Sequence, residues 1–340
     1  MPTLENTRGT VPVRMPRLTM RAKTVIAFAV VYVVWGSTYL GIKVGLNEHL
    51  PPALFGAIRL LSAGALLLAF ARVRGTKLAI TRRDLSTSAI VGLCLLVGGM
   101  YATFLSEQRM DSALAALIVA AAPLWMALAE TVLPGMERPS RRGVLGLVLG
   151  LTGLCLLVGP RLGGVGGSPQ ELIGIAIQIV GTWLWVGGSV VSKKRPLSVD
   201  GTVATGYEML IAGAVLGAIA LVSGDLTNLS FTPTAIAAIA YLSVIGSAVA
   251  FTAFMWLIRN VAASKVMTYA YVNPIVAVAL GYAAGLIGLL DKPETLDAWG
   301  WAGTAVIIAG VALATSAPSR PGHREPIAPE PDELAETPGS

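Results

Sequence analysis

Four ionisable residues lie inside long apolar stretches: Lys43, Arg59, Glu130 and Glu208. A charged side chain in a bilayer costs at least about 2.5–3.5 kcal/mol, so each of them needs a partner or a role. Arg59 lies nine residues into its stretch, about 13 Å deep at about 1.5 Å per residue. Its planar guanidinium suits bidentate binding of a carboxylate. Arg59 therefore either contacts a substrate or a gate, or forms a structural ion pair or carbonyl clamp between helices.

Glu208 lies 149 residues after Arg59, at a similar depth in its own stretch. The two side chains could meet near the midplane as a buried bridge, which would suit a gate or a proton-sensitive element; alternatively, Glu208 faces the cytoplasmic interface. Glu130 and Lys43 lie near the ends of their stretches, where a long side chain can reach water. Because Lys193 repeats Lys43 at a spacing of 150 residues, a gate-lining role for Lys43 stays open.

Polar and aromatic residues in mid-stretch are further candidates for a substrate pocket. A polar group surrounded by lipid needs a partner, so these side chains should face a cavity or a neighbouring helix, with simple packing as the alternative for each aromatic. Pro123 and Pro274 each remove a backbone hydrogen bond, which frees a carbonyl for substrate, water or Asn273, unless they only kink a helix. The candidate lining residues are Trp35, Ser37, Thr38, Tyr39, Tyr101, Gln178, Trp183, Trp185, Tyr269, Tyr271 and Asn273.

The elements that position these residues follow from hydropathy. Apolar residues make up 54% of the 340 residues and charged residues 13%, against about 45–50% and about 25% in soluble domains. Apolar runs near 20 residues are typical of transmembrane helices, so we expect an all-α polytopic membrane protein with ten such helices. The short loops leave no room for a soluble catalytic domain. The predicted spans are 24–46, 51–72, 85–106, 111–132, 142–160, 170–192, 201–222, 233–256, 264–286 and 298–316.

The distribution of Lys and Arg predicts the orientation. Twenty of these residues lie in the tails and loops of one side or at the span ends that border them, and three lie on the other side. This asymmetry places both termini in the cytoplasm of a multi-pass plasma or inner membrane protein, and a net charge of +6 spread in this way indicates topology rather than nucleic-acid binding. We expect residues 1–23 to be a cytoplasmic tail. Residues 317–340, with six prolines and five acidic residues, should form a disordered cytoplasmic tail.

An internal repeat divides the chain into residues 24–160 and 161–316. A shift of 150 residues places Trp35 on Trp185, and a shift of 151 places Pro123 on Pro274. Because each half has five spans, an odd number, the second half should cross the membrane in the opposite sense. Inverted repeats are typical of transporters, since they create two nearly equivalent states around a site at the repeat interface.

The same features resemble a known family. The residues are Trp35-Gly36-Ser37-Thr38 with Lys43, Pro51-Pro52 before Arg59, Pro123 in the fourth span, and the glycines 146, 150 and 153. In this order, and duplicated, they are similar to the EamA repeat of the drug/metabolite transporter superfamily. The resemblance implies a ten-helix fold of two EamA repeats and export of small metabolites. The glutamate that usually follows the proline-containing span is matched by Glu137 in the first half, whereas the second half has Gly288 and Leu289 there, with Asp291 beyond.

These features favour a secondary transporter, most simply an exporter of small polar or zwitterionic metabolites by alternating access. The sequence contains no phosphate-binding GxxxxGK[ST] loop and no paired acidic or nucleophile–base motif in its spans, so we expect no enzyme activity, ATP use, cofactor or metal. A passive channel or facilitator and an intramembrane enzyme are the alternatives. The expected partners are a small-molecule substrate and the bilayer, with a homodimer possible through small-residue faces such as Gly213 with Gly217 and Gly281 with Gly285.

Overall fold

The computed structural model describes residues 19–133, 141–162, 168–224, 231–261, 263–267 and 269–316, and every regular element in these ranges is a helix. Seven helical segments are long and apolar enough to cross a membrane, and two shorter apolar helices follow them, which confirms a multi-pass membrane protein. Most of the predicted cytoplasmic tail 1–23, the tail 317–340 and Glu137 lie outside the described residues. The seven segments are Met20–Asn47, Pro52–Val73, Arg82–Glu107, Ser112–Ala129, Pro169–Lys194, Gly201–Val222 and Pro233–Asn260.

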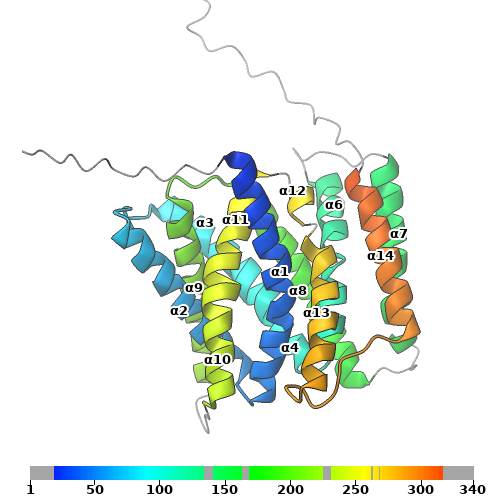
Figure 1. The fold of residues 1–340 in the computed structure, drawn as a ribbon. Coiled ribbons are helices and arrows are strands. Elements are labelled where there is room, and N and C mark those ends of the chain that lie inside the picture. Colours follow the sequence, from blue (N-terminus) through cyan, green and yellow to red (C-terminus); the bar gives the residue numbers. More distant parts are fainter. Residues whose placement is uncertain are drawn as a thin grey trace, which may run out of the picture.

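Each of the ten predicted ranges coincides with one helix or with consecutive helices (Figure 1). Six predicted ends are too early by one to four residues, among them the third, which continues to Glu107, and the eighth, which continues to Asn260. The elements are α1 (Met20–Asn47), α2 (Pro52–Val73), α3 (Arg82–Gly92), η1 (Leu93–Met100), α4 (Tyr101–Glu107), α5 (Ser112–Val119), α6 (Ala122–Val132), α7 (Arg141–Leu162), α8 (Pro169–Lys194), α9 (Gly201–Val222), α10 (Pro233–Tyr241), η2 (Leu242–Val249), α11 (Ala250–Asn260), α12 (Ala263–Val266), α13 (Tyr269–Leu286) and α14 (Ala298–Ser316).

Local sequence sets where the helices begin. The hydroxyls of Thr81, Ser168 and Thr232 each accept a hydrogen bond of 3.1 Å from the backbone N–H three residues later. These caps satisfy one of the N–H groups that the first helical turn leaves free. Proline in the first turn of α2, α8 and α10 costs no helical hydrogen bond.

Two π-helical segments, η1 and η2, interrupt otherwise continuous helices at corresponding places in the two halves of the chain. A π-helix adds a residue to each turn, which turns the side chains that follow to a different face, and such segments often occur at functional sites. Both segments contribute residues to the central cavity described below.

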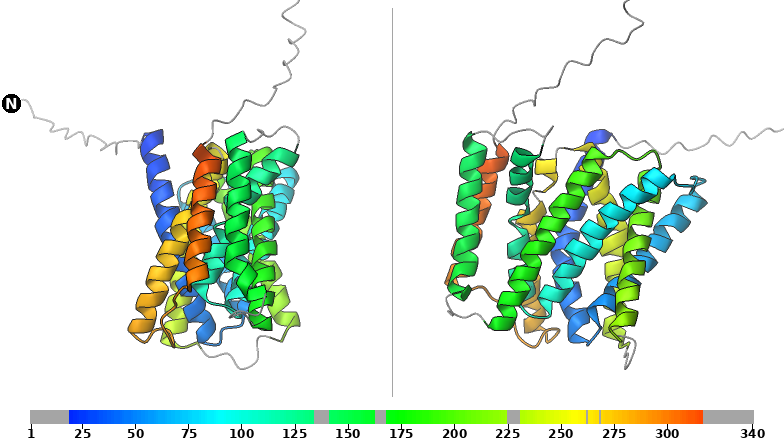
Figure 2. Two further views of the ribbon diagram at one scale, coloured as in Figure 1. Left: turned by 90° about the vertical axis from the view of Figure 1, so that its right-hand side faces the viewer. Right: turned by 180° about the vertical axis from the view of Figure 1, so that it is seen from behind.

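Small residues allow close contact between helices. A Cβ on Gly64 of α2 would lie 3.0 Å from Cγ of Leu210, and a Cβ on Gly213 of α9 would lie 2.9 Å from Cγ of Leu61. A Cβ on Gly153 of α7 would lie 2.6 Å from the backbone N of Ile307 in α14. The helices α7 and α14 stand side by side at one edge of the bundle and pack mainly on each other (Figure 2). These glycines therefore serve packing within the chain.

Candidate functional site

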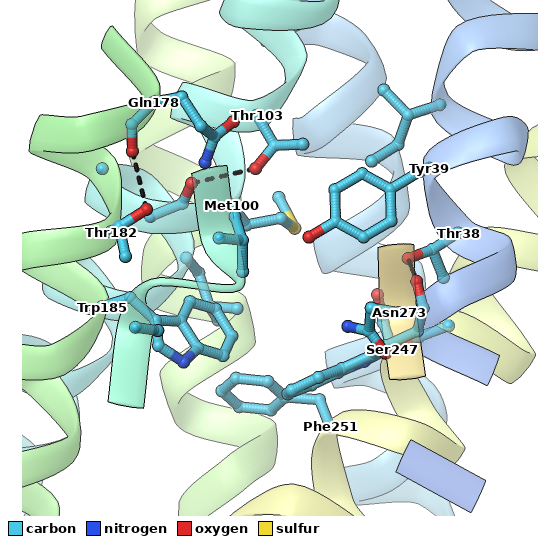
Figure 3. A pocket seen from close by; sticks show the side chains of 18 of the residues that line it. Thr38, Tyr39, Met100, Thr103, Gln178, Thr182, Trp185, Ser247, Phe251 and Asn273 are labelled. Carbon is cyan, nitrogen blue, oxygen red and sulfur yellow. Dashed lines mark hydrogen bonds between the residues drawn. The ribbon is translucent and has the colours of Figure 1, made fainter. Parts of the chain in front are cut away.

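A central cavity lies among α1, α2, η1, α4, α5, α6, α8, η2, α11 and α13. Its volume is about 80 Å³. One water needs about 10–15 Å³ by the same measure, so the cavity has room for several waters or part of a small molecule. Tyr39 points toward Met100, while Trp185 and Phe251 face the open centre from other sides (Figure 3). Helices from both halves of the chain thus build one site.

Arg59 of α2 lines this cavity and is 4% exposed. Its Nε donates a hydrogen bond of 2.7 Å to Oγ of Ser247 in η2, and its Cζ lies 5.9 Å from the centroid of the Phe104 ring. Its Nη1 is buried and has no hydrogen-bond partner among the described residues. A guanidinium held at one nitrogen and unsatisfied at another can bind an anion that enters the cavity.

Aromatic rings form one side of the site. Trp35 lies edge-on to Trp185 at 5.4 Å and to Tyr269 at 4.9 Å between ring centroids, and Phe254 packs against both tryptophans. The indole N–H of Trp35 donates to the carbonyl of Gly246 at 3.2 Å, which fixes this ring to η2. The arrangement gives the cavity a rigid apolar surface suited to an aromatic or aliphatic group.

Neutral polar groups complete the lining. Gln178 of α8 is buried, and its Oε1 accepts a hydrogen bond of 2.7 Å from Ser106. The hydroxyl of Thr38 donates to the carbonyl of Trp35 at 2.7 Å. With its amide oriented to satisfy both groups, Asn273 donates to the carbonyls of Tyr269 and Tyr32 at 3.1 and 3.2 Å. The remaining polar lining residues are Tyr39, Thr103, Thr182 and Ser247.

Glu208 does not pair with Arg59. Its Oε1 lies 3.0 Å from Nη2 of Arg259, which comes from the last turn of α11. Glu208 is fully buried and the Arg259 side chain is 22% exposed. The idea of a midplane Arg59–Glu208 bridge is therefore wrong for this conformation, because Arg59 is hydrogen-bonded to η2 whereas the partner of Glu208 is supplied by α11.

Lys43 is half-buried, and its ammonium donates to the carbonyls of Glu107 and Met110 at 2.8 and 3.0 Å. It therefore holds the end of α4 instead of extending into water. The carboxyl of Glu107 itself is fully buried, and neither oxygen has a hydrogen-bond partner within the described parts of the chain.

Among the candidate residues from the sequence, Trp185 and seven others line the cavity, and the remaining candidates do not. The hydroxyl of Ser37 lies 2.5 Å from that of Tyr241. Trp183 is half-exposed and packs edge-on against Trp125, 5.3 Å away between centroids. Tyr101 is absent from the lining, and the side chains of Glu130 and Tyr271 lie outside what the structure describes. The seven are Trp35, Thr38, Tyr39, Arg59, Gln178, Tyr269 and Asn273.

The two prolines occupy different settings. Pro123 is the second residue of α6, directly after the break that separates α5 from α6. Pro274 lies inside the continuous helix α13, five residues after its start. Neither proline lines the cavity.

Sequence reasoning missed two ionisable residues because the predicted spans ended too early. Glu107 lies one residue beyond the predicted end at 106, and Arg259 lies three beyond the end at 256. It also missed Thr103, Ser247 and Phe251, whose orientation depends on η1 and η2. Longer predicted spans would have included Glu107 and Arg259. No signal in a single sequence marks the π-helical segments η1 and η2.

The chain is similar in sequence to known membrane transporters. The model of the EamA-like transporter family matches residues 22–159 and again 172–316. An Escherichia coli K12 protein described as the uncharacterized inner membrane transporter YedA is 38% identical over 290 residues, covering 85% of this chain and 89% of that protein. An uncharacterized transporter of Archaeoglobus fulgidus is 28% identical, covering 87% and 99% respectively.

The fold also matches a solved crystal structure. The TM-score is 0.63 at 21% identity, and the match covers 88% of this chain and 98% of the other. At this identity the likeness concerns the fold alone. The double match of the family model agrees with the two-repeat resemblance found in the sequence.

Proposed function

Because this chain belongs to the EamA-like transporter family, we propose that it is a secondary transporter that exports small carboxylate-bearing metabolites through the central cavity by alternating access. Ten transmembrane helices in two inverted five-helix repeats would carry out this cycle, with both termini in the cytoplasm. The family and the relatives support a membrane transporter rather than an enzyme; the substrate class, the direction and the mechanism are the proposal.

Reciprocal contacts between α2 and α9 support the inverted arrangement. A shift of 149 residues relates Gly64 to Gly213 and Leu61 to Leu210. Gly64 faces Leu210, and Gly213 faces Leu61. Equivalent residues that exchange partners in this way are expected around a two-fold axis. The contact of Trp35 with its equivalent Trp185, 5.4 Å between centroids, favours the same axis beside the cavity.

The observation that carries the substrate class is the unsatisfied Nη1 of Arg59 in a cavity lined by aromatic rings. A buried unsatisfied donor is costly, and a carboxylate that enters the cavity would relieve this cost. The neighbouring rings would receive an apolar portion of the same molecule. A small molecule with one carboxylate and one aromatic or aliphatic group fits both surfaces.

The test is transport by the purified protein in liposomes. We expect exchange of radiolabelled phenylalanine, inhibited by phenylacetate, which keeps the ring and the carboxylate, but not by phenethylamine, which lacks the carboxylate. A passive channel would give flux without acceleration by substrate on the opposite side. Equal inhibition by both compounds would contradict a role for the carboxylate.

Arg59→Gln should weaken phenylacetate binding by about 10- to 100-fold, since a hydrogen bond to a charged group contributes about 1.5–3 kcal/mol. The matched control is Arg74→Gln, because Arg74 follows the same helix but is exposed and lies over the Phe70 ring. Equal affinities of the two variants, measured by equilibrium binding of labelled phenylacetate, would remove Arg59 from the substrate site.

A further inference from the structure

Glu107 is the last residue of α4, and its carboxyl group is not part of the cavity lining. It is 0% exposed, and both of its oxygens lack a hydrogen-bond partner in the ranges that the structure describes. An ionised carboxylate buried in this way would be very costly, whereas the protonated form avoids most of the cost. The geometry of the site therefore favours a neutral Glu107 in this conformation.

The surroundings of Glu107 place it next to the substrate site. It lies one helical turn after Thr103, which lines the cavity, and three residues after Phe104, whose ring faces Arg59. Residues one turn apart lie on the same face of a helix. Glu107 therefore occupies the border between the cavity and the end of the bundle at which α4 finishes.

The titratable groups that face Glu107 come from three elements. Helix α1 contributes Lys43 and Tyr39, α2 contributes Arg59, and the segment before α14 contributes Glu294. Helix α5 has no titratable residue, and α8 presents the neutral Gln178, which accepts from Ser106. The ammonium of Lys43 is bound to two main-chain carbonyls, and Glu294 accepts hydrogen bonds from Ser112 and Ala113.

Because Glu107 lies close to Arg59, the charge of Glu107 affects how strongly Arg59 attracts a substrate carboxylate. A negative charge on Glu107 would offset the positive charge of Arg59 and reduce its attraction for a second carboxylate. A proton on Glu107 removes that competition, and by reciprocity a bound carboxylate increases the affinity of Glu107 for its proton. The expected sign is tighter substrate binding as the pH falls.

We propose that Glu107 is a proton-binding site whose protonation accompanies the binding of a substrate carboxylate at Arg59. The linkage to substrate rests on the proposed function, whereas the proton site itself does not. Where Glu107 is ionised before the substrate arrives, it would take up at most one proton from the solvent as each carboxylate binds, and its O–H bond is the only bond formed in the protein.

The first test needs no substrate. Infrared difference spectra of the purified protein, recorded during a pH titration, should contain the band of a buried protonated carboxyl. Glu107→Gln should lose this band, and Glu107→Asp should keep a carboxyl band. Glu48→Gln is the matched control, since Glu48 lies at the same end of the bundle but is partly exposed and accepts a hydrogen bond of 2.5 Å from Thr232. Identical spectra for wild type and Glu107→Gln would overturn the proton site.

The second test measures linkage with phenylacetate as the probe. The dissociation constant of the wild type should rise with pH, by up to about tenfold per pH unit for one linked proton. At a pH high enough to ionise Glu107 in the substrate-free protein, binding should take up protons from a weakly buffered solution. Glu107→Gln should bind without either effect, and Glu48→Gln should behave as wild type. Wild-type pH dependence in Glu107→Gln would overturn the linkage. Absence of phenylacetate binding in the wild type would instead reject the proposed substrate class, and the infrared result would still decide the proton site.

Discussion

At the residue scale, the buried charged side chains differ in how many of their polar atoms have a partner. Glu208 has Arg259, and Lys43 has two main-chain carbonyls. Arg59, Glu107 and Glu208 each keep at least one buried atom without a hydrogen-bond partner in the described ranges, but Arg59 is bonded through its Nε and Glu208 through its Oε1, whereas Glu107 has no partner at either oxygen. Structural charges inside a protein are normally paired, so an unpaired buried charge is a better indication of function than charge alone.

The Glu208–Arg259 pair has a stability consequence. Arg259→Gln should destabilise the protein by about 3 kcal/mol, because removal of one partner leaves the other charge buried. The double variant Glu208→Gln/Arg259→Gln should recover part of that loss. Thermal unfolding in detergent measures both. Equal loss in the single and double variants would mean that the stranded charge is not the cause.

At the element scale, the two π-helical segments shape the site. Leu96, Gly99 and Met100 of η1, and Gly246 with Ser247 of η2, reach the cavity from opposite halves of the chain. Ser247 also fixes Arg59. Helix pairs at the edge, such as α7 with α14, contribute no residue to the lining and rely on glycine contacts.

The contact between α7 and α14 leads to a second stability prediction. Gly153→Leu should destabilise the protein by about 1–3 kcal/mol, the usual cost of overpacking, since even a Cβ would lie 2.6 Å from a backbone nitrogen of α14. Gly187→Leu is the matched control, because a Cβ there meets nothing within 4 Å. The comparison uses thermal unfolding; equal shifts for the two variants would contradict the packing role of Gly153.

At the scale of the whole molecule, the chain passes back and forth between two ends. The loop 74–81 lies at one end, together with the start of α1 and the end of α14, and the loop 287–297 lies at the other (Figure 1). Among the residues that the structure describes, the excess of Lys and Arg lies at the end where α1 begins and α14 finishes. Positively charged loops are retained in the cytoplasm, so this end should face the cytoplasm.

Cysteine labelling tests this orientation. In a background that lacks Cys94 and Cys155, Lys77→Cys should react with an impermeant maleimide only after cells are permeabilised. Asp291→Cys should react in intact cells, because it is exposed at the opposite end. Labelling of Lys77→Cys in intact cells would reverse the orientation.

The sequence by itself determined the elements of this protein, because apolar runs of fixed length are a local property and the bilayer demands them. It also identified Arg59, Trp35 and Gln178, since a polar or large aromatic side chain in such a run is expected to face a cavity or a neighbouring helix. Only the tertiary structure decided which charges are paired: Glu208 with Arg259 instead of Arg59, and Glu107 with no hydrogen-bond partner among the described residues. Pairing depends on distances between helices far apart in sequence and on the turn added by η1 and η2, and hydropathy contains neither.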